Sequence, residues 1–244
     1  MRKDFPIFDR EINGKRLVYL DSAASSQKPR VVIDAMTRFM ETSYAPTHRS
    51  AYTLASEATE AYEMARLKVR RFVNARSETE IIFTKNATEA LNLVAYSWGR
   101  ANLTAGDVVV LTQMEHHANI VPWHMLAAER GIVLRWVPLT PDGLLDLTDL
   151  DRLLDGAKVF GFTAMSNVLG TITPVRHLSD AAHAHGALAV VDGCQHVPHV
   201  PTDVQAMGAD FLAFSSHKMC GPSGVGVLWG REELLDAMPP FLGG

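Results

Sequence analysis

The sequence predicts an α/β protein with a doubly wound, mainly parallel sheet of about seven strands and helices on both faces. Two observations predict this class. Short apolar runs rich in β-branched residues alternate along the chain with amphipathic helical patterns, which is the order that parallel strands joined by helices require. Several of these runs are apolar at every position, as in strands that are covered on both faces.

Eight segments are expected to be strands, with helices between them. The strand candidates are residues 17–20, 80–84, 108–111, 133–137, 158–162, 188–192, 211–214 and 225–229. The helix candidates are residues 56–73, 86–98, 175–185 and 231–238, together with a helix that begins near Asn119. In the first of these helices, apolar residues recur every three or four positions and form one stripe. Gly186 follows residues 175–185, where a glycine commonly ends a helix.

The composition narrows the classes of function. The chain has 244 residues, 47% of them hydrophobic and 20% charged, which is ordinary for a globular protein. A net charge of −4 without a basic stripe argues against nucleic acid as a partner. No apolar run is long enough to span a membrane, and the first residues lack a signal-peptide core. Cys194 and Cys220 give no disulfide framework, so we expect a cytoplasmic protein; one structural disulfide is the alternative.

Polar residues follow three predicted strands, at the sheet edge where ligands of open parallel sheets bind. After the first of them, Asn86 can cap a helix whose first amide groups and Thr88 hydroxyl can bind an anion; a plainly capped helix is the alternative. Asp192 ends a second apolar run, and Gln195 follows it. A buried carboxylate there needs a cationic or N–H partner, although capping of a turn also explains it.

The third strand end carries Lys218, in the segment SSHKMCGPSGVG. The glycines let the backbone bend closely around this lysine, although a salt-bridged surface lysine is the alternative. An anion cradle, a carboxylate and an amine at one sheet edge are what pyridoxal 5'-phosphate requires. A buried lysine loses its charge readily and can act as a nucleophile and proton carrier. His116 or His117 could stack on the ring, and no third ligand at metal spacing accompanies them.

Six motifs carry a resemblance to a known family. They are YLDSAASSQKP, FTKNATEALNLVAYSWG, MEHHANIVPW, AMSNVLGTITPV, VVDGCQHVPH and SSHKMCGPSGVGVLWG, in this order along essentially the whole chain. In these motifs the chain resembles the Suf-type cysteine desulfurases, which are pyridoxal-phosphate enzymes of fold type I, class V. The resemblance implies a homodimer that converts L-cysteine to L-alanine. The sulfur would pass as a persulfide to a sulfur-acceptor protein of a Suf-type system for iron–sulfur cluster assembly.

The resemblance also assigns roles to individual residues. Lys218 and His116 would be catalytic: Lys218 would bind the cofactor aldehyde covalently, and His116 would stack on the ring and relay protons. Asp192 would pair with the pyridine nitrogen, and Gln195 with the phenolic oxygen. The phosphate would be held by Ala87 through its N–H and by Thr88, Ser215 and His217. Asn167 would lie near the substrate and the ring oxygen.

An irregular N-terminal arm (1–16) is expected before the first predicted strand, and the resemblance implies a cofactor-binding large domain (17–244). A C-terminal small domain would lie outside these residues, with the persulfide-forming cysteine and an arginine that binds the substrate carboxylate. We expect Cys194 and Cys220 to pack in the core instead. Ser216 replaces a family glycine, so it is strained if φ is positive there, or it adds a hydroxyl near the phosphate. The alternative functions are selenocysteine lyase, another β-eliminating class V enzyme, and a truncated non-catalytic module that binds the cofactor or dimerises.

Overall fold

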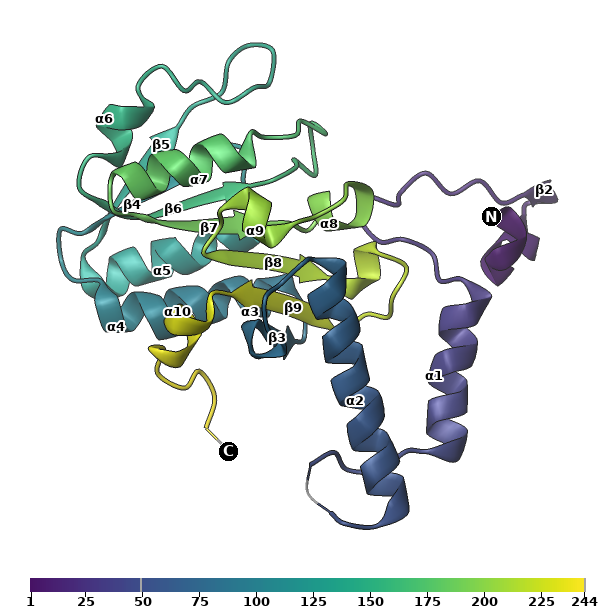
Figure 1. Ribbon diagram of the computed structural model, residues 1–244. Coiled ribbons are helices and arrows are strands. Elements are labelled where there is room, and N and C mark those ends of the chain that lie inside the picture. Colours follow the sequence, from purple (N-terminus) through teal and green to yellow (C-terminus); the bar gives the residue numbers. More distant parts are fainter. Residues whose placement is uncertain (49, 244) are drawn as a thin grey trace.

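The centre of the molecule is a seven-stranded sheet in the order β3-β9-β8-β7-β6-β4-β5 (Figure 1). The computed structural model describes residues 1–48 and 50–243. Strands β8, β7, β6, β4 and β5 are parallel, whereas β9 runs antiparallel to both β8 and β3. The strands are β3 (Ile81–Thr84), β4 (Val108–Thr112), β5 (Val133–Val137), β6 (Ala157–Thr163), β7 (Leu188–Asp192), β8 (Phe211–Ser215) and β9 (Gly226–Gly230). The predicted fold class and seven of the eight strand candidates are confirmed.

Helices cover both faces of this sheet (Figure 1). Alternate side chains of one strand enter different cores: Val110 of β4 belongs to one apolar cluster and Val109 to the other. Leu178 of α7 (Val175–Ala184) packs in the first cluster and Trp123 of α5 (Val121–Arg130) in the second. This two-sided burial explains why the strand sequences are apolar at successive positions. The helices at the sheet are α3 (Ala87–Leu93), α4 (Arg100–Asn102), α5 (Val121–Arg130), α6 (Leu150–Leu154), α7 (Val175–Ala184), α8 (His196–His199), α9 (Val204–Met207) and α10 (Glu232–Asp236).

The helix predicted at residues 86–98 is longer and less regular than expected. After α3 the chain continues through a π-helical segment, η4 (Val94–Gly99), directly into α4. A Cβ atom on Gly99 would lie 2.9 Å from Leu126 of α5. The glycine therefore permits the close packing of η4 on α5. Within the described residues, no helix is both long and apolar enough to cross a membrane.

The prediction of a strand at residues 17–20 is wrong. Val18 and Leu20 are 71% and 91% exposed, and these residues pair with no strand in the described part of the chain. Apolar sequence alone does not make a strand without a neighbouring strand and a face to bury. The arm before it is also more ordered than predicted: it contains the 3-10 turns η1 (Arg2–Asp4) and η2 (Pro6–Asp9) and the hairpin β1 (Glu11–Ile12) and β2 (Lys15–Arg16).

The two helices that follow the arm extend away from the sheet (Figure 1). Helix α1 (Arg30–Thr42) has no buried residue, and α2 (Thr53–Phe72) buries only Ala55 and Ala58. Between arm and helix, residues 23–28 return to the sheet, where Ser26 donates its backbone N–H to the carbonyl oxygen of His217. This return brings the N-terminal region to the polar end of the sheet.

Candidate functional site

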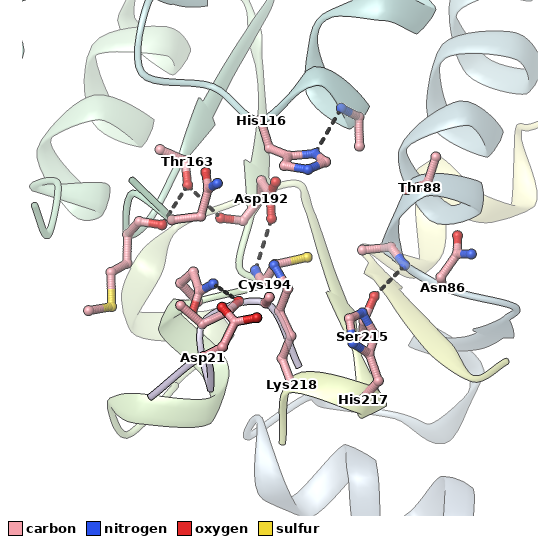
Figure 2. A pocket seen from close by; sticks show the side chains of 17 residues that line it. Asp21, Asn86, Thr88, His116, Thr163, Asp192, Cys194, Ser215, His217 and Lys218 are labelled. Carbon is pink, nitrogen blue, oxygen red and sulfur yellow. Dashed lines mark hydrogen bonds between the residues drawn. The ribbon is translucent and has the colours of Figure 1, made fainter. Parts of the chain in front are cut away.

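A cavity of about 490 Å³ opens at the carboxyl ends of β6, β7 and β8, beside the first turn of α3 (Figure 2). Its volume lies within the range of small-molecule sites. The structure brings all the predicted site residues to its wall. They are Ala87, Thr88, His116, Asn167, Asp192, Gln195, Ser215, His217 and Lys218. Strands far apart in sequence end together here because they are parallel neighbours in the sheet, so the topology assembles the site.

An anion cradle is formed by the first turn of α3 and the end of β8. The Asn86 side chain accepts a hydrogen bond from the N–H of Glu89 at 2.8 Å and so caps the helix. The N–H of Ala87 donates to the Ser215 hydroxyl at 2.8 Å. Thr88 and His217 lie at the same side of the cavity (Figure 2). Helix amides and hydroxyl groups arranged in this way bind phosphate groups.

The close approach of β9 to this turn depends on Gly226. A Cβ atom at Gly226 would overlap the backbone of Asn86 and would lie 2.9 Å from the Ala87 nitrogen. Any other residue would therefore push the α3 turn away from the end of β8. The glycine-rich stretch thus has a specific geometric reason at this position.

Asp192 lies at the end of β7 and is 3% exposed. Its carboxylate accepts the N–H of Cys194 at 2.9 Å, the one N–H group that donates to it within the described part of the chain, and the Cys194 thiol lies against it. A buried carboxylate with so few donors is well suited to a cationic ring nitrogen in the cavity. The residues therefore fit pyridoxal 5'-phosphate at this end of the site.

Lys218 ends the 3-10 turn η6 (Ser216–Lys218), directly after β8. Its side chain points into the cavity, toward Asp192 and Cys194 (Figure 2). The carbonyl oxygen before it, that of His217, accepts hydrogen bonds from the Ser26 N–H, the Ser26 hydroxyl and the Lys28 ammonium, each at 3.0 Å. The N-terminal segment thereby holds the loop that carries the lysine.

His116 lies across the cavity from Lys218 (Figure 2). It precedes the 3-10 turn η5 (His117–Asn119), and its Nδ1 accepts the N–H of Ala118 at 3.0 Å. This bond fixes the orientation of the imidazole ring. Within the described part of the chain, His116 lines the cavity, whereas the neighbouring His117 does not.

Burial, together with nearby charges, shifts the pKa values of two groups in the cavity wall. Burial, followed by the charges of Lys218 and Lys28, lowers the pKa of His217. Burial, followed by the charge of Asp192, raises the pKa of the Cys194 thiol well above its usual value. Cys194 packs against the second apolar cluster, as expected, and also lines the cavity; its thiol stays protonated at neutral pH. A protonated thiol is a poor nucleophile.

Ser216 and Cys220 differ from the expectations. Ser216 has no positive φ, and its hydroxyl donates to the carbonyl oxygen of Pro222, so the expected strain is absent and the hydroxyl is engaged outside the cavity. The left-handed position is Cys220, with φ of 65°. Its N–H donates to the Ser26 hydroxyl at 2.7 Å. Both cysteines are free thiols.

Sequence reasoning missed several residues of the cavity wall. Asp21 and Ala23 come from the N-terminal segment, and Ala23 accepts a 2.6 Å hydrogen bond from the Gln195 amide. Thr163, the last residue of β6, also lines the cavity. Its position one residue beyond a predicted strand could have identified it. Nothing in the local sequence indicates that the N-terminal segment folds back over Gln195.

The profile of the aminotransferase class-V family matches residues 18–244, and the chain belongs to this family. Among curated relatives, the "Probable cysteine desulfurase" of Streptomyces coelicolor is 53% identical over 250 residues, which cover 100% of this chain and 60% of the relative. The "Cysteine desulfurase" of Klebsiella pneumoniae is 52% identical over 245 residues, again covering 100% and 60%. The chain thus spans about 60% of the length of these relatives.

Solved structures of similar proteins share the fold. The apo cysteine desulfurase from Thermococcus onnurineus NA1 superposes with a TM-score of 0.93 at 39% identity, over 100% of this chain and 59% of that chain. The cysteine desulfurase CsdA from Escherichia coli superposes with a TM-score of 0.88 at 40% identity, over 100% and 60%. These matches confirm the predicted α/β fold, which is that of pyridoxal-phosphate enzymes of fold type I.

Proposed function

We propose that the chain forms the cofactor-binding part of a pyridoxal-phosphate-dependent cysteine desulfurase. One observation carries this proposal: three chemical groups line a single cavity. They are the amine of Lys218, the buried carboxylate of Asp192 with its one N–H donor, and the anion cradle at the first turn of α3. These are the groups that the amine-reactive aldehyde, the ring nitrogen and the phosphate of this cofactor need. The names of the relatives support the same activity.

Each residue would have a defined task in this reaction. When bound, the cofactor supplies a ring that withdraws electrons from the substrate carbon. Lys218 would hold the aldehyde, release it to the substrate amine and then carry the Cα proton. Asp192 would keep the ring nitrogen protonated, and His116 would cover one ring face and move protons. The phosphate would be held by Ala87, Thr88, Ser215 and His217, and the ring oxygen by Gln195 and Asn167.

The substrate and the sulfur acceptor are parts of the same proposal. L-cysteine would lose its sulfur to a thiolate and leave as L-alanine. Cys194 is a poor candidate for that thiolate because the raised pKa keeps its thiol protonated. Cys220 does not line the cavity among the described residues. The thiolate would therefore belong to a part of the protein beyond these residues, and a Suf-type acceptor protein would take the sulfur onward. The proposal also includes an N-terminal arm at 1–16 and a large domain at 17–244, in a protein that forms a homodimer. The two free thiols are consistent with a cytoplasmic location.

Cofactor loading is the first test. The chain incubated with pyridoxal 5'-phosphate should develop an absorption band at about 420 nm, which is typical of this cofactor on a lysine. Lys218→Ala should abolish the band. Lys158→Ala, at the exposed amino end of β6, is the matched control and should keep it. A wild-type chain that never develops the band would contradict cofactor binding by these residues.

Turnover separates the alternatives. A loaded chain that releases alanine from cysteine in the presence of dithiothreitol supports the desulfurase. Release from selenocysteine alone would favour a selenocysteine lyase or another β-eliminating relative. A loaded chain without turnover on either substrate would favour a non-catalytic cofactor-binding module.

A further inference from the structure

Glu115 is a half-buried acid behind the cavity wall, hydrogen-bonded to the buried residues Thr112, Asn119 and Thr163, and neither the motifs nor the proposed chemistry gives it a task. We propose that Glu115 is a positioning residue that fixes the turn carrying His116 to the ends of β4 and β6, and so sets how His116 faces Asp192 across the cofactor. This inference rests on the proposed function. It assigns Glu115 no contact with the cofactor.

The carboxylate of Glu115 joins three separate elements. One of its oxygens accepts the Thr112 hydroxyl of β4 at 2.5 Å and the Thr163 N–H of β6 at 2.7 Å. The other oxygen accepts the Asn119 amide of η5 at 2.7 Å. Since each donor comes from a different element, loss of this carboxylate would release all three at once.

One of these bonds spans the turn that carries His116. Glu115 and Asn119 flank the histidine, and the Asn119 N–H also donates to the His116 carbonyl oxygen at 2.9 Å. Together with the bond from the Ala118 N–H to His116 Nδ1, these contacts fix both the backbone and the ring. The position of His116 over the cavity therefore depends on the Glu115 carboxyl.

A second bond leads to Asp192. Thr163, which donates its N–H to Glu115, is the register partner of Asp192 in the β6–β7 pair. The next residue, Ala164, donates its N–H to the Asp192 carbonyl oxygen at 2.9 Å. Glu115 thereby links the turn that carries His116 to the end of β7 that carries Asp192.

The charge of Glu115 is consistent with this role. Burial raises the pKa of Glu115 to about 8, and the nearby negative charge of Asp192 adds to the increase. The groups on β4, β6 and η5 that donate hydrogen bonds to Glu115 are neutral. The charged group that raises its pKa is Asp192 on the neighbouring strand β7. At neutral pH the Glu115 carboxyl is therefore mostly protonated, so that it adds little negative charge beside Asp192.

Asn119 can adapt to either form of Glu115. Its amide oxygen is buried and has no hydrogen-bond partner within the described residues. If the amide turns over, this oxygen can accept the proton of a neutral carboxyl. A glutamine at position 115 can make the same bond, so Glu115→Gln imitates the neutral acid while Glu115→Ala removes the link.

The first experiment measures backbone hydrogen exchange in the chain without cofactor. Glu115→Ala should accelerate exchange in residues 112–120 and at Thr163 by about tenfold, because loss of the shared acceptor leaves buried donors unpaired. Glu115→Gln should stay within about threefold of wild type. Glu129→Ala, which removes an exposed ion pair on α5, is the control and should leave these segments unchanged. Unchanged exchange in Glu115→Ala overturns the inference, whether or not cofactor binds.

The second experiment measures the dissociation constant of pyridoxal 5'-phosphate from pH 6 to 9. At pH 7, Glu115→Ala should weaken binding about tenfold, and Glu115→Gln should bind within about threefold of wild type. Above pH 8 the ratio of the wild-type affinity to that of Glu115→Gln should change, because only wild type gains a second anion next to Asp192. A merely structural acid would not produce this difference.

The outcomes separate the two proposals. If wild type binds cofactor and Glu115→Ala binds it equally well, the positioning role is wrong and the proposed function stands. If wild type and Glu115→Gln keep a constant affinity ratio across pH 8, the charge argument is wrong. If wild type binds no cofactor, the proposed function fails, and the claim that Glu115 orients the cofactor site fails with it.

Discussion

Asp192 shows how a single residue can be poised for a ligand. Its carboxylate is at the end of an apolar strand, is 3% exposed and has one N–H donor. Burial of a charge with so little compensation is costly unless a cation arrives. The strand position could be predicted from the sequence, because an aspartate ends an apolar run. The single donor could not, because it depends on the turn at Gly193.

Replacement of Asp192 by asparagine tests this assignment. In Asp192→Asn the amide oxygen can still accept the Cys194 N–H, so the fold should persist, but the side chain supplies no charge to a ring nitrogen. We expect the dissociation constant of pyridoxal 5'-phosphate to rise at least about tenfold, which corresponds to about 1.4 kcal/mol. Equilibrium titration by absorbance measures it. Asp142→Asn, on an exposed turn, is the control, and equal affinities in the two variants would refute the counter-ion role.

Two elements, β9 and α3, meet closely enough to require a glycine. The sequence predicts both elements and the glycine-rich stretch between β8 and β9, but not which glycine is needed for contact. Gly226 is the one whose Cβ would overlap the Asn86 backbone. The sequence likewise predicts a strand at residues 17–20 that does not form, since no neighbouring strand covers Val18 or Leu20. Contacts between elements are therefore what local pattern fails to supply.

Gly226→Ala should disturb this contact. The added methyl group must displace the α3 turn or β9, which costs about 1–3 kcal/mol of the free energy of unfolding. The anion cradle should weaken at the same time, because Ala87 and Ser215 would separate. Urea unfolding measures the first effect and cofactor titration the second. Gly243→Ala, where an added Cβ meets nothing within 4 Å, should change neither; an equally stable Gly226→Ala variant would exclude the overlap.

At the scale of the whole molecule, a parallel sheet gathers distant motifs at one edge. The resemblance and the strand ends together predict nine residues of the cavity wall, and all of them line one cavity. Glu115 was missed because its importance lies in bonds to β4, β6 and η5, which are separated by up to 48 positions in sequence. The fold and the cavity residues were thus largely predictable, whereas the hydrogen bonds of Glu115 behind the cavity wall were not.

The stability of the whole molecule should depend on the Glu115 proton. Because folding raises the pKa of this acid from 4.5 to about 8, the folded chain binds its proton more tightly than the unfolded chain does. The stabilisation is complete below pH 4.5 and is lost as the pH rises to about 8. We expect the free energy of unfolding of wild type to fall by at least about 1 kcal/mol relative to Glu115→Gln over this window. Urea denaturation at several pH values measures it, and parallel curves would contradict the raised pKa.

The most direct measurement is chemical mapping of the lysine that binds the cofactor. The chain is incubated with pyridoxal 5'-phosphate, reduced with borohydride to make the lysine–aldehyde bond permanent, digested and analysed by mass spectrometry. The account predicts a single stoichiometric modification, on the peptide that contains Lys218, and its loss in Lys218→Ala. Stoichiometric modification of another lysine, or none under conditions in which the folded chain is intact, would contradict it.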